Sequence, residues 1–244
     1  MSFAKYKNLS CVSITDHDTF AAYATAPKIA DELGLELIPG IEISSVDKGR
    51  DVHILGYFCD IQNTEFLSAL ELQRENRKNR VRESLEKLRK LGIDISYEQV
   101  KQHCAGVSIG RPHIASALLA AKYVHSFYEA FELYLKEGAP AFSSLRGFSL
   151  ETAVSLINKS GGLAVMAHPE YTNADDLIPQ LVEYGIKGIE VYNSKSAKNI
   201  NKYKNIAKKY KLVETGGSDY HDGLSLGDQS LPYSIVENLK NIRS

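Results

Sequence analysis

Four stretches of this chain place histidine or acidic residues directly after a run of apolar residues. The first is Thr15-Asp16-His17-Asp18-Thr19, which follows Cys11-Val12-Ser13-Ile14. The others are Gly40-Ile41-Glu42, Ala167-His168-Pro169 and Gly217-Ser218-Asp219-Tyr220-His221. The apolar runs are typical of buried strands, and α/β folds hold their reactive groups where strands end. We therefore expect these side chains to converge on one site.

Strand and helix patterns alternate over most of the chain. Helical patterns separate five predicted strands, at 11–15, 35–38, 163–166, 188–192 and 212–215. Repeated βα units of this kind predict a parallel sheet. Because polar residues follow many of the strands, a barrel is favoured over an open sheet.

A hairpin is predicted close to the second of these strands. The strand over 35–38 is expected to end in a turn at Pro39-Gly40. Alternating residues at 41–44 and 51–58 then flank Asp47-Lys48-Gly49, and this arrangement predicts two antiparallel strands joined by a tight turn.

Residues 63–146 interrupt the alternation with helical patterns alone. The predicted helices cover 64–91, a segment beginning at Ser96, a segment opened by Gly110-Arg111-Pro112-His113, and 126–137. We therefore predict a first barrel part over 1–62, an all-helical insertion over 63–146 and a second barrel part over 147–244.

The composition is that of an ordinary soluble protein, and a cytoplasmic location is expected. Apolar residues make up 43% of the 244 residues, and the net charge of −1 provides no general attraction to nucleic acid or membrane. The three cysteines form no C-x-x-C pair, which fits a reducing compartment. No apolar stretch approaches the roughly 18 residues of a membrane span, and no signal peptide is recognisable at the start.

Histidine and carboxylate side chains together suit zinc, manganese or iron. The histidines at or beside predicted strand ends and the accompanying carboxylates are His17, His53, His168 and His221, with Asp16, Asp18, Glu42 and Asp219. A single histidine at a strand end is more often structural or merely exposed. Four histidines at or beside the ends of different predicted strands predict a metal site. In such a site a carboxylate such as Glu42 could bridge two ions.

These motifs, taken together and in order, resemble the polymerase-and-histidinol-phosphatase (PHP) family of metal-dependent phosphoesterases. The similarity is greatest to the subgroup that has a helical insertion and acts on nucleotide phosphates. The matching segments are Thr15-Asp16-His17-Asp18-Thr19, Ile38-Pro39-Gly40-Ile41-Glu42-Ile43-Ser44, Val52-His53-Ile54-Leu55-Gly56-Tyr57, Gly110-Arg111-Pro112-His113, Ala167-His168-Pro169 and Gly217-Ser218-Asp219-Tyr220-His221.

The resemblance implies a distorted seven-stranded β/α barrel with up to three metal ions at the carboxyl ends of its strands. Carried over by motif, Glu42 would bridge two ions. The other ligands would be His53 and His168 on one ion, Asp219 on the second, and His17 and His221 on a third. Asp16 would be a ligand or orienting group in the same shell, so that Asp16 and His17 are the expected catalytic residues.

The chain departs from the family pattern at its start. Family members begin with a strand bearing His-x-His and a Ser-Asp-Gly stretch, and neither precedes His17 here. The Glu42/His53/His168 position alone keeps all its expected ligands, so fewer than three ions are expected. A barrel lacking its first strand would expose an edge that invites self-association. Two explanations stay open: Met1 is an internal start, or the chain is a truncated variant with impaired catalysis.

The predicted insertion contains two possible contacts for a phosphate. Gly110-Arg111-Pro112-His113 opens a helix, whose first N–H groups together with a forked guanidinium suit phosphate oxygens. Arg111 and His113 are therefore candidate substrate ligands; a plain capping turn is the alternative. The basic run over 74–90 is either a solvated helix face or a rim that attracts polyanions.

The resemblance thus predicts a metal-dependent phosphoesterase. Its substrates would be phosphate esters of nucleotides or short oligoribonucleotides, hydrolysed by a metal-activated water. The alternative is a truncated, non-catalytic protein that binds phosphate ligands or a partner.

Overall fold

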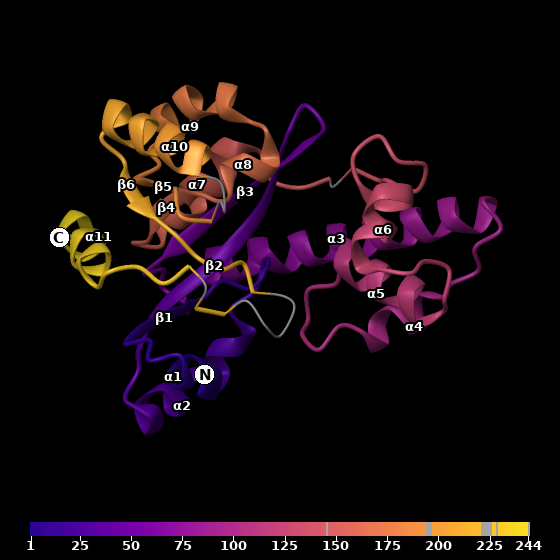
Figure 1. The fold of residues 1–244 in the computed structure, drawn as a ribbon, viewed down its shortest axis with the longest axis horizontal. Helices are drawn as coiled ribbons and strands as arrows, with labels where there is room; N and C mark the ends of the chain where they lie inside the picture. Colours follow the sequence, from indigo (N-terminus) through magenta and orange to yellow (C-terminus); the bar gives the residue numbers. More distant parts are fainter. Residues whose placement is uncertain (145, 194–196, 221–225, 228, 244) are drawn as a thin grey trace. The chain divides into compact units, whose positions relative to one another are not determined.

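The structure, a computed structural model, describes residues 1–144, 146–193, 197–220, 226–227 and 229–243 (Figure 1). The chain divides into two compact units. Unit 1 comprises 1–45, 52–67 and 148–244, and unit 2 comprises 46–51 and 68–147. Each unit is described separately below.

Unit 1 is a mixed α/β unit built around a curled sheet (Figure 1). Its elements are α1 (Ser2–Tyr6), β1 (Cys11–Ile14), η1 (Ala21–Ala24), α2 (Ala26–Leu33), most of β2 (Glu36–Asp47) and β3 (Arg50–Tyr57), α7 (Leu150–Lys159), β4 (Leu163–Met166), α8 (Pro169–Thr172), η3 (Asp175–Leu177), α9 (Ile178–Tyr184), β5 (Gly188–Glu190), α10 (Ala197–Tyr210), β6 (Val213–Thr215) and α11 (Ser234–Arg243). Unit 2 holds the tip of the β2–β3 hairpin, most of α3 (Thr64–Lys90), α4 (Tyr97–Gln102), α5 (Arg111–Ala120), α6 (Phe127–Ala130) and the π-helical turn η2 (Phe131–Leu135).

The six strands lie in the order β1-β2-β3-β4-β5-β6. Strands β1 and β2 are parallel, as are β4, β5 and β6, but β3 runs antiparallel to β4. The sheet is therefore mixed rather than parallel throughout. Its antiparallel member β3 belongs to the predicted hairpin, which reverses the chain after β2 without a crossover helix.

The predicted turn at Pro39-Gly40 was also wrong, because β2 passes through both residues without a break. Proline cannot donate a ladder hydrogen bond, and a tyrosine from η1 supports the strand at this point. The Tyr23 hydroxyl accepts a hydrogen bond from Gly40 N at 2.7 Å and lies 2.9 Å from Ile38 O. A side chain at position 40 would collide with β1, since its Cβ would lie 2.1 Å from Ser13 Oγ.

Several local predictions agree with the structure. The hairpin turns at Lys48 and Gly49, whose φ angles of 48° and 89° are those of a two-residue type I′ turn. Gly34 ends α2 in the left-handed conformation. Ser96 and Gln99 form the predicted capping box of α4.

The apolar interior of unit 1 includes a helix that the sequence patterns did not reveal. In α11, Leu239 packs with Ile38, Phe58 and Leu163, and partly buried residues of β1, β3 and β6 join them. The contacts lie near the amino ends of β1, β4 and β6. Helix α11 therefore covers the end of the sheet opposite the strand exits.

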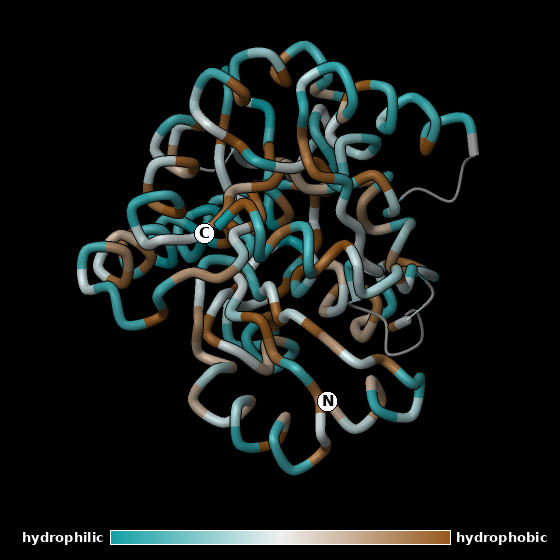
Figure 2. The backbone as a smooth tube through the Cα atoms, turned by 90° about the vertical axis from the view of Figure 1, so that its left-hand side faces the viewer, coloured by the Kyte–Doolittle hydropathy of each residue, from teal (hydrophilic) through white to brown (hydrophobic). Residues whose placement is uncertain are grey.

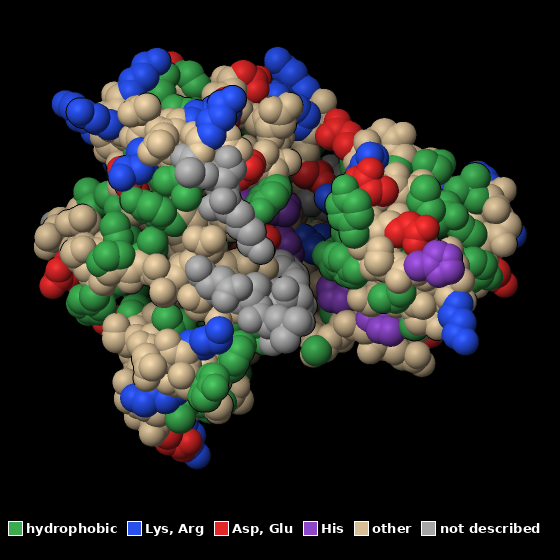
Figure 3. Space-filling model, in the orientation of Figure 1, with side chains coloured by type: hydrophobic (Ala, Val, Ile, Leu, Met, Phe, Trp, Pro, Cys, Tyr) green, Lys and Arg blue, Asp and Glu red, His purple; other side chains and the backbone are tan. Residues whose placement is uncertain are grey.

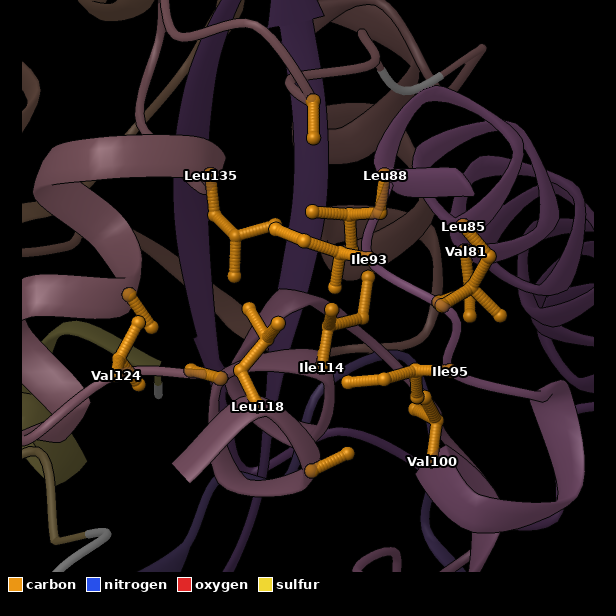
Figure 4. Close-up of a cluster of buried hydrophobic side chains, with 14 of the residues drawn as sticks. Val81, Leu85, Leu88, Ile93, Ile95, Val100, Ile114, Leu118, Val124 and Leu135 are labelled. Carbon is orange, nitrogen blue, oxygen red and sulfur yellow. The ribbon is translucent and has the colours of Figure 1, made fainter. Parts of the chain in front are cut away.

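Unit 2 has its own core, shown in Figure 4. Val81, Leu85 and Leu88 of α3 pack against Ile114 and Leu118 of α5 within one buried cluster. In unit 1, helices that face the viewer in Figure 2 carry hydrophobic and hydrophilic residues in alternation along their turns, as amphipathic helices do. Among the described residues, no helix combines the length and apolar composition that crossing a lipid bilayer requires.

Candidate metal centre

Glu42 stands at the centre of a group of histidines in unit 1. Its Oε1 atom lies 2.7 Å from His53 Nδ1 and 3.0 Å from His168 Nε2. Its Oε2 atom lies 3.7 Å from His17 Nδ1. The carboxylate is buried, with 5% of the residue exposed. The two oxygens therefore face different histidines, as in a carboxylate that bridges two sites.

The backbone explains how these side chains meet. Glu42 belongs to β2, His53 to β3, and His168 lies two residues after the end of β4. His17 forms an isolated parallel bridge with Glu42, in which Glu42 N donates to Asp16 O at 3.2 Å. Neighbouring strands thus bring these side chains together, with Glu42 and His53 inside their strands rather than at strand ends.

The two aspartates beside His17 have different environments. Asp18 is fully buried, and its Oδ1 accepts a hydrogen bond from Ser44 N at 2.9 Å. Asp18 thereby ties the loop after β1 to β2, which is a structural role. Asp16 is exposed, and its assignment as an orienting or catalytic group stays a prediction.

The geometry of the group fits a divalent cation. His53 Nδ1 and His168 Nε2 lie 3.3 Å apart, and both lie beside Glu42 Oε1. In tetrahedral coordination with bonds of about 2.0–2.1 Å, neighbouring ligand atoms are about 3.3 Å apart. Ligand atoms of His17, Glu42 and His53 all lie within 4.8 Å of one another. Imidazole nitrogens packed against a carboxylate oxygen are a donor set for zinc, manganese or iron.

A buried nitrogen of His168 lies outside this contact. His168 Nδ1 has no hydrogen-bond partner among the described residues, although it is buried. Because Nε2 is the atom that faces Glu42 and His53, Nδ1 is not a ligand atom of this position.

The charges and hydrogen bonds within this group shift the pKa values of Glu42 and His168. Burial alone would raise the pKa of Glu42, but the charges of His17 and His53 and the hydrogen bonds of His168 and His53 hold it well below its usual range. Burial alone would lower the pKa of His168, yet its hydrogen bond to Glu42 and the Glu42 charge raise it to about 9. Glu42 is therefore a carboxylate at neutral pH, ready to bind a cation.

Glu190 is a buried acidic residue that the sequence analysis missed. It ends β5, is 5% exposed, and its Oε2 accepts a hydrogen bond from His168 N at 2.8 Å. Burial raises the pKa of Glu190 to about 7. The available signal was its position, because Gly188-Ile189-Glu190 repeats the pattern of an acid at the end of an apolar strand.

The remaining predicted ligands lie after β6. Asp219 is exposed, has a φ of 45°, and its charge raises the pKa of both His168 and Glu190. Asp219 is therefore close enough to the group for its charge to act on His168 and Glu190. His221 lies outside the described residues, and its assignment stays a prediction.

Arg111 and His113 belong to unit 2. Arg111 Nη2 lies 2.7 Å from Asp51 Oδ2 and its Nη1 donates to Leu135 O at 3.3 Å. Burial and the charge of Arg80 lower the pKa of Arg111 to about 10. His113 Nδ1 accepts a hydrogen bond from Gly110 N at 2.9 Å, which caps α5. Both contacts are within the unit, so a role in binding phosphate remains a prediction.

The basic run of α3 contains two kinds of residue. Arg77 and Arg80 are buried and donate to Ile109 O and Ser143 O, respectively. Exposed members pair along the helix, as Arg89 does with Glu86. Lysine, arginine and acidic side chains are interspersed on the face shown in Figure 3. The run is thus partly structural and partly a solvated face.

Comparison with known proteins identifies relatives over most of the chain. No family model matches it. The chain is 32% identical over 221 residues to a 5'-3' exoribonuclease of Haemophilus influenzae, covering 88% of this chain and 80% of the relative. It is 30% identical to a phosphoribosyl 1,2-cyclic phosphate 1,2-diphosphodiesterase of Eggerthella lenta, covering 89% and 85%. A 3',5'-nucleoside bisphosphate phosphatase of Chromobacterium violaceum is 33% identical, with 86% and 76% covered.

Two solved structures share the fold. A protein of Bifidobacterium adolescentis, described provisionally as a metal-dependent phosphoesterase, aligns with a TM-score of 0.89 and 27% identity over 100% of this chain and 89% of that one. An amidohydrolase of Chromobacterium violaceum, solved with sulfate and without metal, aligns with a TM-score of 0.89 and 30% identity over 98% and 88%. The mixed α/β architecture is therefore common to both proteins and this chain.

Proposed function

The chain belongs to the PHP family of phosphoesterases, and on that basis we propose that it hydrolyses phosphate esters of nucleotides or short oligoribonucleotides. Water is the nucleophile and divalent metal ions are the cofactor. The observation that carries the proposal is the convergence of His53 Nδ1 and His168 Nε2 on Glu42 Oε1, with a distance of 3.3 Å between the two nitrogens.

The side chains around Glu42 would hold the metal ions in two positions. Glu42, His53 and His168 form one position, and the second Glu42 oxygen, together with His17, faces another. Asp219 and His221 are assigned by motif to complete the shells, with Asp16 as a ligand or orienting group. Bound divalent ions supply Lewis acidity toward a phosphoryl oxygen and toward the attacking water. Manganese, zinc and iron all suit this donor set.

Residues of the chain itself prepare this site for an anionic substrate. Three imidazoles around one carboxylate leave the group neutral or positive once cations are bound, which favours a phosphate. His17 lies at the edge of the group, with 18% of its side chain exposed, where it would be a ligand at the solvent-facing side of the second position. Buried Asp18 fixes the loop that carries His17.

The substrate class is supported by the relatives. Their names describe an exoribonuclease, a cyclic phosphate diphosphodiesterase and a bisphosphate phosphatase, which share phosphate-ester bonds on ribose. We assign Arg111 and His113 as contacts for a substrate phosphate, since Arg111 opens α5, where N–H groups suit anions. Of the two guanidinium groups that face Asp51, that of Arg111 is the more exposed, with 19% of its side chain accessible against 7% for Arg80.

We further propose that unit 1 is a distorted β/α barrel of the family type and that residues 63–146 form the helical insertion. The division of the chain into two compact units supports this assignment. Each unit has a separate apolar core, which is expected of an inserted domain.

The test uses the purified chain stripped with a chelator and reloaded with Mn²⁺ or Zn²⁺. Hydrolysis would be measured on a nucleoside 3',5'-bisphosphate, a 5'-phosphorylated dinucleotide and glycerol 2-phosphate, with metal content determined in parallel. Metal-dependent release of phosphate or mononucleotide, fastest with the nucleotide substrates, is expected. A chain that binds no transition metal and cleaves none of the three would refute the enzyme and favour a phosphate-binding protein.

A further inference from the structure

Glu190 lies between the two segments that carry predicted metal ligands. It ends β5, which pairs with β4 on one side and with β6 on the other. His168 follows β4, and Asp219 follows β6. We infer that Glu190 is a positioning residue that holds the His168 backbone in its ligand conformation and spaces the segments after β4 and β6. The inference rests on the proposed metal site.

The backbone at His168 needs such support. Its φ of 24° and ψ of 60° lie in the left-handed region, which residues with a Cβ rarely adopt. Asp219 is also in that region, with a φ of 45°. Strained residues persist where surrounding contacts over-determine them. The 2.8 Å hydrogen bond from His168 N to Glu190 Oε2 is such a contact, and it fixes the peptide plane just before the strained residue.

The other carboxylate oxygen faces the segment after β6. A Cβ built on Gly217 would lie 3.0 Å from Glu190 Oε1, so the carboxylate fills the space that a side chain there would need. Asn193 Nδ2 donates to Gly217 O at 3.3 Å and so also holds this segment. Glu190 thus contacts the His168 backbone with one oxygen and packs against the Gly217 backbone with the other.

This arrangement distinguishes Glu190 from a metal ligand. One oxygen accepts the His168 N–H and the other is directed at a glycine backbone. By contrast, both Glu42 oxygens face imidazole nitrogens. A group that acts by accepting a hydrogen bond should be replaced well by a neutral acceptor, whereas a ligand should not.

The experiment compares Glu190→Gln and Glu190→Ala with the unmodified full chain. Mn²⁺ binding would be measured by calorimetry and by electron paramagnetic resonance. The Gln variant keeps an acceptor oxygen and is expected to bind within a few-fold of wild type. The Ala variant is expected to lose about 10- to 100-fold in affinity, the usual effect of removing a residue that orients a ligand. Glu183→Gln, an exposed residue of α9, is the matched control and should leave binding unchanged.

A second readout is independent of metal. In the metal-free chain labelled with ¹⁵N-histidine, the His168 backbone amide should resonate downfield because its N–H is bonded to a carboxylate. The signal should shift upfield modestly in Glu190→Gln and strongly in Glu190→Ala. If the Ala variant does not fold, the Gln variant alone tests the inference. It must then still bind Mn²⁺ and show a hydrogen-bonded His168 amide; loss of either result overturns the role of Glu190.

The outcomes separate this inference from the proposed function. A wild-type chain that binds no Mn²⁺ overturns the metal site itself. A wild-type chain that binds Mn²⁺, alongside a folded Ala variant with equal affinity, overturns the role of Glu190 alone. A Gln variant that loses as much affinity as the Ala variant would also overturn it, because the carboxylate charge would then be what matters.

Discussion

Two buried polar groups in this chain are each centred on one carboxylate of the same hairpin. In unit 1, Glu42 of β2 is surrounded by His17, His53 and His168; we refer to these four residues as the Glu42 group. In unit 2, Asp51 of β3 is paired with two guanidinium groups, and Asp51, Arg80 and Arg111 form the Asp51 group. Both carboxylates are largely buried, so each depends on its partners.

The histidines around Glu42 and the arginines around Asp51 differ in one chemical respect. Imidazole can lose its proton near neutral pH and then offer a lone pair to a metal, whereas guanidinium stays charged and has no lone pair to offer. The Glu42 group can therefore exchange protons for cations. The Asp51 group is a fixed ion cluster that holds the hairpin tip to α3 and α5 within unit 2. Burial of a carboxylate alone does not mark a metal site; the ionisation of its neighbours does.

The largest effect is expected from His168→Ala. The variant removes one ligand from the Glu42/His53/His168 position, so that position should lose its ion. Loss of the several kcal/mol that a metal contributes to the transition state would reduce hydrolysis by roughly 10³-fold or more. Metal content by elemental analysis and phosphatase rates check this. His125→Ala, an exposed histidine of unit 2, is the control. Unchanged metal stoichiometry in His168→Ala would remove His168 from the site.

Asp51→Ala should affect stability rather than chemistry. It leaves the Arg80 and Arg111 guanidiniums without their carboxylate, and the loss of one partner of a buried ion cluster costs roughly 3–5 kcal/mol. Urea denaturation followed by circular dichroism measures the change. Asp47→Ala, which breaks a short-range pair with Arg50 on the same hairpin, should cost about 1 kcal/mol or less. Equal destabilisation by Asp51→Ala and Asp47→Ala would contradict the distinction between the buried ion cluster and the short-range pair.

The two groups should also differ in their response to pH. The pKa of His168 is raised to about 9 in the folded, metal-free chain, against an unfolded value near 6.5. Its stabilising contribution is therefore complete below about pH 6.5 and is lost as pH rises through about 9, on the order of 3 kcal/mol. The guanidinium of Arg111, whose pKa is about 10, stays mostly charged up to about pH 9.

Unfolding of the metal-free chain at pH 6.5 and 9.5 tests this prediction, with His168→Ala as the reference that lacks the titrating group. The wild-type chain should lose more stability than the variant between the two pH values. Mn²⁺ affinity should rise over the same interval, because protons compete with the metal for His168 Nε2. A pH dependence identical in both chains would exclude His168 as the titrating residue.

The smallest effect is expected from Arg111→Lys. Lysine keeps the charge near Asp51 but cannot also reach Leu135 O, to which Arg111 Nη1 donates at 3.3 Å. The loss should be about 1–2 kcal/mol, smaller than for Asp51→Ala. If Arg111 binds a substrate phosphate as proposed, KM should rise in the same variant while the metal content stays constant. A variant with normal KM would restrict Arg111 to its structural role.

Local features of the fold could be predicted because they depend on neighbouring residues. The type I′ turn at Lys48-Gly49, the Gly34 helix end and the Ser96–Gln99 capping box each involve a few consecutive residues. The continuity of β2 through Pro39 could not be predicted in this way. It depends on the Tyr23 hydroxyl, which is 17 residues from Gly40 in the sequence.

The sequence indicated which side chains could lie close together but not their geometry. His17, Glu42, His53 and His168 were expected to meet because they lie at or beside predicted strand ends, whereas in the structure Glu42 and His53 lie inside β2 and β3. Glu190 lies in the same pattern, but no motif distinguished its acid from an ordinary strand residue. The inward orientation of Arg80 could not be predicted either. A basic run on a helix does not reveal which of its members points inward and pairs with Asp51.

By itself the amino-acid sequence determined the family, the kinds of ligand atom available and the helical character of residues 63–146, because motifs and periodicity are local properties of the chain. The tertiary structure decided which atoms meet: Glu42 Oε1 with His168 Nε2 across 126 residues, Glu190 with the His168 backbone across 22, and Asp51 with Arg111 across 60. Such contacts depend on how strands stack and where loops return. The same two ingredients, a carboxylate and basic side chains, therefore form a candidate metal centre in one unit and an ion cluster in the other.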